Sequence, residues 1–234
     1  MKLKTIVLLF ISLLFTSCKE EIPASIKLKI EFENKLNRDL SKIYGIQVYK
    51  DGKIFREFRA FEKPYIQEEI ILDSLVNGSY KIVYENLINQ TLQKTINIKE
   101  NKLYEVSIFP DYSDYRDLVG ESFVRNLKEN QKVEFYFESL GCFHSAKENL
   151  IVSKTDKTYY VEYNGKRRIL NKKELDAIIK MECELELIKY GGCTTSDHYS
   201  IKSGNQEKEF YDETCKWNGW NNLIKLLNLK KTKV

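Results

Sequence analysis

Alternating hydrophobic and polar residues dominate the first half of the chain. Residues 25–33 alternate strictly and place Ile26, Leu28, Ile30 and Phe32 on one side, which is the period of a half-buried β-strand. Turn pairs such as Asp51-Gly52 and Asn77-Gly78 separate further runs of this kind. The predicted strands cover residues 25–33, 43–49, 53–58, 65–72, 79–84, 92–98 and 103–109. About seven short strands at this spacing predict an all-β sandwich over residues 25–110.

The second half combines strand and helix patterns. Asn171 followed by Glu174 is typical of a capping box at the start of a helix, and Gly191-Gly192 would end that helix. Residues 217–229 have the apolar spacing of an amphipathic helix. The predicted strands are residues 132–139, 149–153, 158–163, 166–170, 198–203 and 207–211. We therefore expect an α+β domain over residues 131–234, with an antiparallel sheet and two helices.

Residues 111–130 connect the two predicted domains. They begin with the polar and aromatic stretch Asp111-Tyr112-Ser113-Asp114-Tyr115. The acids in it do not have the spacing of a calcium loop. We expect a linker that leads into a short helix over residues 117–128.

Composition narrows the class of protein. The 234 residues are 42% hydrophobic, enough for packed cores. The 38 Lys and Arg residues nearly balance the 34 Asp and Glu residues. No basic stripe stands out, so we expect no nucleic-acid partner.

The N-terminus has the pattern of an export signal. Lys2 and Lys4 precede the apolar residues 6–15, a run too short to span a bilayer but typical of a signal peptide. The sequence Phe15-Thr16-Ser17-Cys18 resembles the lipobox of bacterial lipoproteins. This resemblance implies a signal peptide over residues 1–17, lipid (palmitate-type acyl chains) on Cys18 as a membrane anchor, and a tether over residues 18–24. The alternative is an ordinary signal peptide with Cys18 free or disulfide-bonded.

The charged residues after Cys18 carry a second resemblance. Lys19-Glu20-Glu21 is similar to the signal that sends lipoproteins of the Bacteroidota to the cell surface. It implies an outer-membrane lipoprotein that is exposed at the surface.

Each half also resembles known domain families. Residues 75–82 (Leu-Val-Asn-Gly-Ser-Tyr-Lys-Ile) resemble a strand entry of transthyretin-like and carboxypeptidase-regulatory-like domains, which implies a sandwich used as a spacer or binding scaffold. Gly141-Cys142-Phe143, followed by a hairpin and a helix, resembles an uncharacterised family of bacterial secreted and lipoprotein domains. That family has no assigned activity.

Four cysteines remain after Cys18, namely Cys142, Cys183, Cys193 and Cys215. An even number in an exported chain predicts disulfides. Three pairings are open, and we favour Cys183–Cys193 with Cys142–Cys215.

The same region contains the residues for a competing hypothesis. Cys142, His144, Cys193 and His198 could ligate zinc, but their spacing differs from the usual zinc pairs. A Cys142–His144 nucleophilic dyad is a further possibility. Disulfides account more simply for these cysteines, so we expect no metal and no cofactor.

Two other clusters are interpreted as structural. Glu182, Glu184 and Glu186 are expected on a solvated helix face, because residues two apart on a helix do not face each other. Trp217 and Trp220 are expected in the core and at its rim, with a sugar-stacking platform as the alternative.

The resulting hypothesis is a lipid-anchored envelope lipoprotein that binds an envelope protein or a surface ligand without catalysis. The alternatives are a metal-dependent or Cys/His enzyme in residues 131–234, and an immunity or inhibitor lipoprotein.

Overall fold

A computed structural model describes residues 23–34, 45–59, 69–141, 144–189, 191–192 and 195–229, without the side chain of His144. The predicted signal peptide and Cys18 lie outside these residues, as do Cys142 and Cys193. The described chain is mostly β, as predicted, with strands in three sheets and few helices. Within it, no helix has the length and apolar character needed to cross a bilayer.

The N-terminal part (described residues from 23 to 110) consists of two sheets. One has the strand order β4-β1-β7 and the other β3-β2-β5-β6. Buried side chains of both sheets, including Leu28, Val48 and Tyr80, share one hydrophobic cluster. The strands are β1 (Ala24–Ile30), β2 (Gly45–Lys50), β3 (Lys53–Arg59), β4 (Glu69–Leu75), β5 (Gly78–Glu85), β6 (Thr91–Ile98) and β7 (Leu103–Ile108).

Strand β1 is the central strand of its sheet. It pairs antiparallel with β4, and it pairs parallel with β7 from Ser25↔Leu103 to Ile30↔Ile108. The strict alternation of β1 is reproduced in its burial, because every second side chain from Ala24 to Ile30 is buried. The first and last strands of the N-terminal part are thus hydrogen-bonded neighbours.

The predicted turn at Asp51-Gly52 is confirmed. Asp51 has a φ of 49° and Gly52 a φ of 80°, which are the left-handed values of the turns that match strand twist. The turn joins β2 and β3 as an antiparallel pair.

The C-terminal part (described residues from 131 to 229) is built on one antiparallel sheet. Its strand order is β11-β10-β9-β8-β12-β13. The strands are β8 (Lys132–Gly141), β9 (His144–Thr155), β10 (Thr158–Tyr163), β11 (Lys166–Ile169), β12 (Ser196–Ser203) and β13 (Gln206–Asp212). Each of the six predicted strands is present, and β9 begins earlier than expected.

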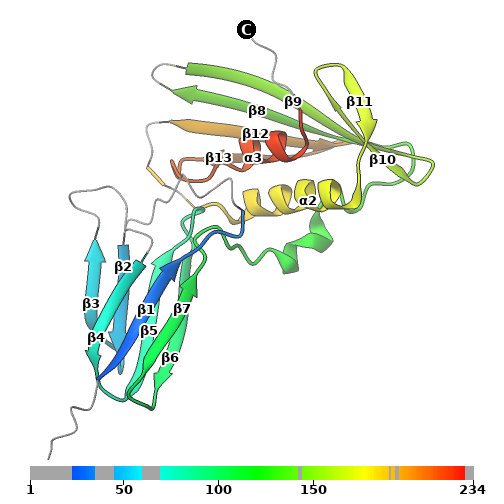
Figure 1. The fold of residues 1–234 in the computed structure, drawn as a ribbon. Helices are drawn as coiled ribbons and strands as arrows, with labels where there is room; N and C mark the ends of the chain where they lie inside the picture. Colours follow the sequence, from blue (N-terminus) through cyan, green and yellow to red (C-terminus); the bar gives the residue numbers. More distant parts are fainter. Residues whose placement is uncertain are drawn as a thin grey trace, which may run out of the picture.

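Two helices, α2 (Lys172–Leu187) and α3 (Gly219–Leu226), pack on one face of this sheet (Figure 1). Their buried side chains form a second hydrophobic cluster with the inward side of the strands. Trp220 belongs to this cluster and stacks on Phe137 with ring centroids 5.1 Å apart. Trp220 is therefore a core residue, as expected, rather than a sugar platform.

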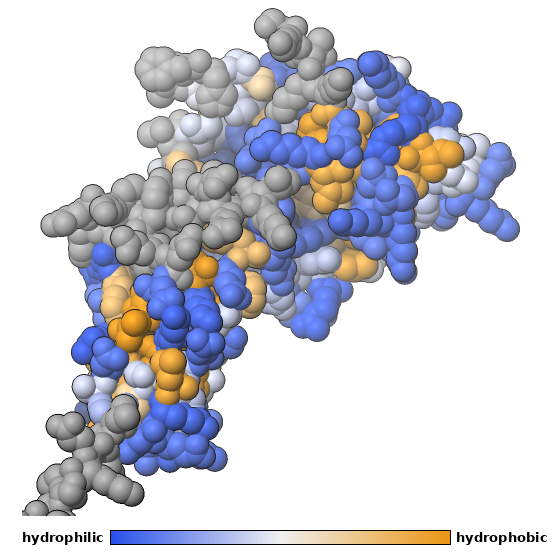
Figure 2. Space-filling view, viewed as in Figure 1, coloured by the Kyte–Doolittle hydropathy of each residue, from blue (hydrophilic) through white to orange (hydrophobic). Residues whose placement is uncertain are grey.

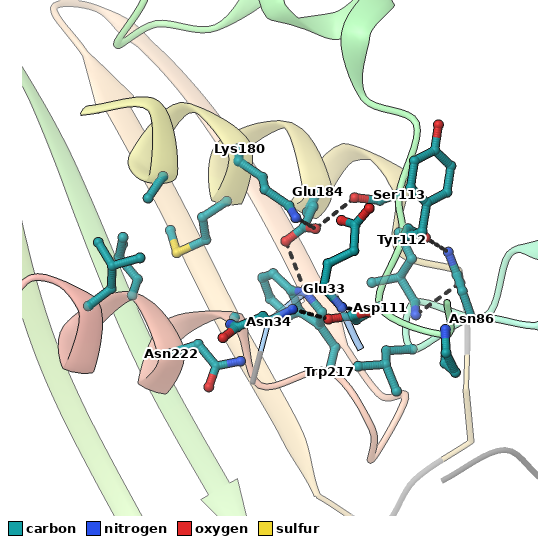
Figure 3. A pocket seen from close by; sticks show the side chains of 18 of the residues that line it. Glu33, Asn34, Asn86, Asp111, Tyr112, Ser113, Lys180, Glu184, Trp217 and Asn222 are labelled. Atoms are coloured by element: carbon teal, nitrogen blue, oxygen red, sulfur yellow. Dashed lines mark hydrogen bonds and ion pairs between the residues drawn. The ribbon is translucent and has the colours of Figure 1, made fainter. Parts of the chain in front are cut away.

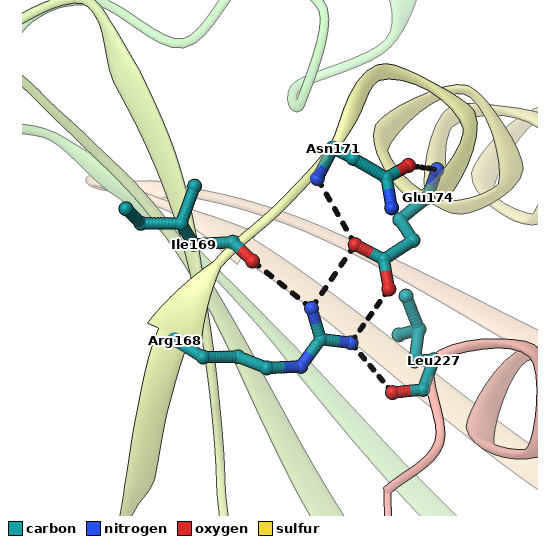
Figure 4. A network of polar contacts seen from close by, with 5 residues as sticks. All are labelled: Arg168, Ile169, Asn171, Glu174 and Leu227. Atoms are coloured by element: carbon teal, nitrogen blue, oxygen red, sulfur yellow. Dashed lines mark hydrogen bonds and ion pairs between the residues drawn. The ribbon is translucent and has the colours of Figure 1, made fainter.

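The predicted capping box at the start of α2 is confirmed. The Asn171 side chain accepts from the Glu174 amide at 3.0 Å, and the Glu174 carboxylate accepts from the Asn171 amide at 3.0 Å. The same carboxylate receives both terminal nitrogens of Arg168, which also reach the carbonyls of Ile169 and Leu227 (Figure 4). One guanidinium thus joins β11, the start of α2 and the end of α3.

The predicted helix over residues 117–128 is wrong in its extent. The structure has a short 3₁₀ helix, η2 (Arg116–Glu121), followed by a turn. Glu182 of α2 explains the break, because its carboxylate accepts from the Ser122 hydroxyl at 2.5 Å and from the amides of Phe123 and Val124. The expectation of a solvated Glu182 is wrong as well, since this side chain is buried.

The favoured pairing of Cys183 with Cys193 is also wrong. Cys183 is a free thiol that is 1% exposed and lies in the hydrophobic cluster of the C-terminal part. The side chain of Cys183 is on the buried side of α2, which extends to Leu187. Cys215 is disulfide-bonded. The other favoured pairing, Cys142–Cys215, involves Cys142, which lies outside the described residues. No disulfide joins two described residues, so the predicted pair of disulfides is not supported as proposed.

Candidate functional site

A cleft of about 500 Å³ lies where the N-terminal part meets helices α2 and α3 (Figure 3). Its size is within the range of small-molecule sites, which occur preferentially between domains. One wall comes from the end of β1, the β5–β6 loop and the linker. The other comes from α2, the segment before α3, and α3. Residues that define the walls include Glu33, Tyr112, Lys180, Met181, Trp217 and Leu223.

Asp111 fixes the first wall. Its carboxylate accepts hydrogen bonds from the backbone amides of Glu33 at 2.9 Å and Asn34 at 2.8 Å. The linker thereby clamps the chain immediately after β1. The sequence places Asp111 seventy-eight positions from Glu33, so no local pattern predicts this contact.

Glu184 connects three elements at the back of the cleft. Its carboxylate accepts from the Ser113 hydroxyl at 2.7 Å and from the Trp217 indole at 3.2 Å. Lys180 lies 3.7 Å away on the same helix. Burial raises the pKa of Glu184 in spite of these partners. The Glu184 side chain is 12% exposed, so the expectation that it is solvated is wrong. Its carboxylate joins α2 to the linker and to the segment before α3.

The β5–β6 loop attaches the N-terminal part to the rest of the molecule. Asn86 accepts from the amides of Ile88 and Gln90 and donates to the carbonyl of Tyr112 at 3.0 Å. Leu87 and Ile88 are buried, and the Lys189 amide donates to the Ile88 carbonyl at 3.1 Å. The loop is thus fully hydrogen-bonded at its turn.

Lys216 secures the same loop from the other side. Its ammonium donates to Asn89 Oδ1 at 2.9 Å and lies 3.7 Å from the Glu85 carboxylate. Burial lowers the pKa of Lys216, while Glu85 acts in the opposite direction. These contacts hold the two walls of the cleft in position before any ligand binds.

The cleft offers groups for binding rather than for bond breaking. Lys173 and Lys180 lie on α2 and Glu33 on the opposite wall, around the apolar side chains of Ala177, Met181, Leu223 and Leu226. Among the described residues that line the cleft there is no histidine or cysteine. The carboxylate of Glu184 is already engaged by two donors.

The sequence-predicted metal candidates are not brought into this cleft. His198 lies on the opposite, helix-free face of the six-stranded sheet, stacked on Tyr211 with ring centroids 4.8 Å apart. Cys142 and Cys193 lie outside the described residues, and so does the side chain of His144. Among the described residues, no group of three His, Cys, Asp or Glu side chains could hold a metal ion.

The helix-free sheet face also contains two shallow hollows of about 350 and 370 Å³, which share Tyr136 and Asn149. Two of the carboxylates that line the second hollow are paired, Glu134 with Lys132 at 2.6 Å and Glu207 with Lys202 at 3.1 Å. In the space-filling view, hydrophobic side chains of both parts are interspersed with hydrophilic ones (Figure 2).

The fold and the cleft define a mostly-β protein with a polar-rimmed, apolar-floored cleft between its two parts. No family model matches the chain, and no curated protein matches it. Among solved structures, a DUF3823 family protein from Bacteroides uniformis is similar at 10% identity and a TM-score of 0.23, over 81% of this chain and 96% of that one. At this TM-score the likeness carries no argument about function.

Proposed function

We propose that the protein is a lipid-anchored envelope lipoprotein whose cleft binds a small ligand without catalysis. The observation that carries the binding role is the cleft itself. Two parts of the chain build it, and Glu184, Asp111 and Asn86 fix its walls by hydrogen bonds. Preformed walls favour binding because the protein loses little conformational entropy when the ligand enters.

The anchoring part of the proposal rests on the sequence. Residues 1–18 resemble a lipoprotein export signal, and Lys19-Glu20-Glu21 resemble a surface-export signal. We propose that Cys18 carries the lipid, that the protein faces the outside of the outer membrane, and that the two parts are separate domains. Intact mass of the chain purified from membranes tests the lipidation of Cys18. The Cys18→Ser variant is expected to lack the lipid and to be released from the membrane.

The binding part is tested by filling the cleft. In Ala177→Trp a large side chain occupies the α2 wall, whereas Asp176→Trp places the same side chain on the exposed neighbouring position. A panel of small envelope-type solutes is screened by thermal shift against both variants and the unmodified chain. A solute that stabilises the unmodified chain and Asp176→Trp but not Ala177→Trp supports the proposal. Stabilisation that is equal in all three proteins contradicts it.

A further inference from the structure

The two walls of the cleft carry opposite charges. Lys173 and Lys180 line it from α2, two helical turns apart on one face, and Glu33 lines it from the segment that follows β1. The close-up view shows Glu33 and Lys180 both directed into the cleft (Figure 3).

These charges are only partly compensated within the protein. Lys180 has Glu184 at 3.7 Å, a carboxylate that already accepts from Ser113 and Trp217. Neither Lys173 nor the Glu33 carboxylate forms an ion pair with any other described residue. The α2 wall thus presents two ammonium groups beside the engaged carboxylate of Glu184. The other wall presents the Glu33 carboxylate beside Asp111, whose oxygens accept from backbone amides.

The floor between the charged walls is apolar. Met181 and Leu223 are 3% and 4% exposed, and Ala177 and Leu226 extend the same surface. An apolar floor favours a ligand with an apolar body. Charged walls of both signs select a ligand that itself carries both signs, because a net anion or cation would leave one wall unmatched.

From this complementarity we propose that the cleft binds a zwitterion with an apolar side chain, either a free amino acid or a short peptide. Its carboxylate contacts Lys173 and Lys180, its ammonium contacts Glu33, and its side chain packs on Met181 and Leu223. This inference rests on the proposed binding function and names the ligand class of the same cleft.

Titration calorimetry with the full mature chain tests the inference. The probes are leucine, Leu-Leu and Leu-Leu-Leu, each compared with its N-acetylated and C-amidated forms. We expect binding of at least one zwitterion, with about tenfold weaker binding when either terminus is blocked, since hydrogen bonds to charged groups are worth about this much. The shortest of the three probes that binds distinguishes an amino-acid site from a peptide site.

Matched variants connect the effect to the cleft. Lys173→Gln and Glu33→Gln should each weaken the zwitterion about tenfold, and the blocked probe should be insensitive to the corresponding change. Lys172→Gln and Glu31→Gln, which alter exposed neighbours outside the cleft, should leave the affinity unchanged.

Three results would overturn the inference. These are equal affinity for blocked and unblocked probes, equal losses in the control variants, or no zwitterion binding at all. If another solute binds and Ala177→Trp abolishes that binding, the ligand class is wrong while the proposed binding function stands. If Ala177→Trp and Asp176→Trp behave alike toward every solute, the proposed function itself fails.

Discussion

The indole ring of Trp217 lies against Gly219, at a place where a Cβ atom would come within 2.0 Å of ring carbon Cζ2. Gly219 is the first residue of α3, a position where alanine ordinarily stabilises a helix. Here the ring needs the space that the missing side chain leaves. Because Trp217 also donates to Glu184, the glycine helps to shape the cleft.

Gly219→Ala should therefore destabilise the protein, by about 1–3 kcal/mol as in other overpacked sites. Gly120→Ala is the matched control, since a Cβ at Gly120 meets nothing within 4 Å. Urea denaturation of both variants measures the difference. A Gly219→Ala protein as stable as Gly120→Ala would show that the ring is free to move aside.

Asp212 predicts a pH dependence of stability. Burial, with a smaller contribution from Asp197, raises the pKa of Asp212 to about 6, while hydrogen bonds from Thr214 act in the opposite direction. The unfolded value is about 4. Between these two values the folded state binds more protons than the unfolded state, so stability falls as the pH rises.

Asp212→Asn removes this contribution and keeps an acceptor for the Thr214 amide. Relative to the unmodified protein, the variant should gain up to about 3 kcal/mol at pH 7.5 and much less at pH 4. Glu209→Gln, an exposed change on the same strand, should stay within about 0.5 kcal/mol at both values. Denaturation curves at the two pH values measure these differences in stability. A gain in the Asp212→Asn variant that is independent of pH would contradict the raised pKa of Asp212.

The contacts of Arg168 predict that lysine at this position lowers the stability of the protein. Its planar group bonds both oxygens of Glu174, at 3.0 and 2.8 Å, as well as two carbonyls. Lysine cannot reproduce this fork. Arg168→Lys should cost about 1–2 kcal/mol, and Arg167→Lys, which alters only an exposed contact with Tyr160, less than 1 kcal/mol. If thermal denaturation showed the same loss of stability in both variants, the hydrogen bonds of Arg168 would not stabilise the protein as proposed.

The turn between β9 and β10 predicts a stabilising change. Asp156 and Lys157 have φ angles of 50° and 61°, left-handed values that cost a lysine about 1 kcal/mol. Lys157→Gly should raise the unfolding free energy by about 0.5–1 kcal/mol, because Asp-Gly suits this turn. A chemical denaturation midpoint that does not rise would show that the turn relaxes at no cost.

Cys183 predicts a slow thiol reaction. Burial raises the pKa of this thiol to about 11, and Glu182 and Glu186 act in the same direction. Since the thiolate is the reactive form, Cys183 should resist a thiol reagent in the native chain and react readily in denaturant without reductant. Peptide mapping that found Cys183 in a disulfide would restore the pairing rejected above.

Local patterns predicted most of the strands. Alternation located β1 and β8, and the capping residues Asn171 and Glu174 located the start of α2, because these signals depend only on near neighbours. The 117–128 helix was mispredicted because a distant carboxylate, Glu182, competes for the amides that would have continued it.

The cleft could not be predicted from the sequence. Its walls meet through contacts between residues far apart in the chain, such as Asp111 with Glu33 and Ser113 with Glu184. Helix spacing alone places Glu182 and Glu184 on a solvated helix face, and no local rule shows that the linker packs over them. Only the tertiary structure brings Ser113 to Glu184, and Ser122 and Phe123 to Glu182.

The central position of β1 has a mechanical consequence. Under the proposed anchor at Cys18, a pull on the protein enters through β1, whose bonds to β4 and β7 lie across the direction of that pull. Bonds loaded in this way must break together rather than one after another. A force on the anchored protein at a cell surface would then be resisted by all strands of the β4-β1-β7 sheet together. Single-molecule pulling from the N-terminus should therefore record one high-force unfolding event for β1 instead of the stepwise loss of its hydrogen bonds. The strand nearest the membrane would serve as the strain-bearing attachment for everything that follows it.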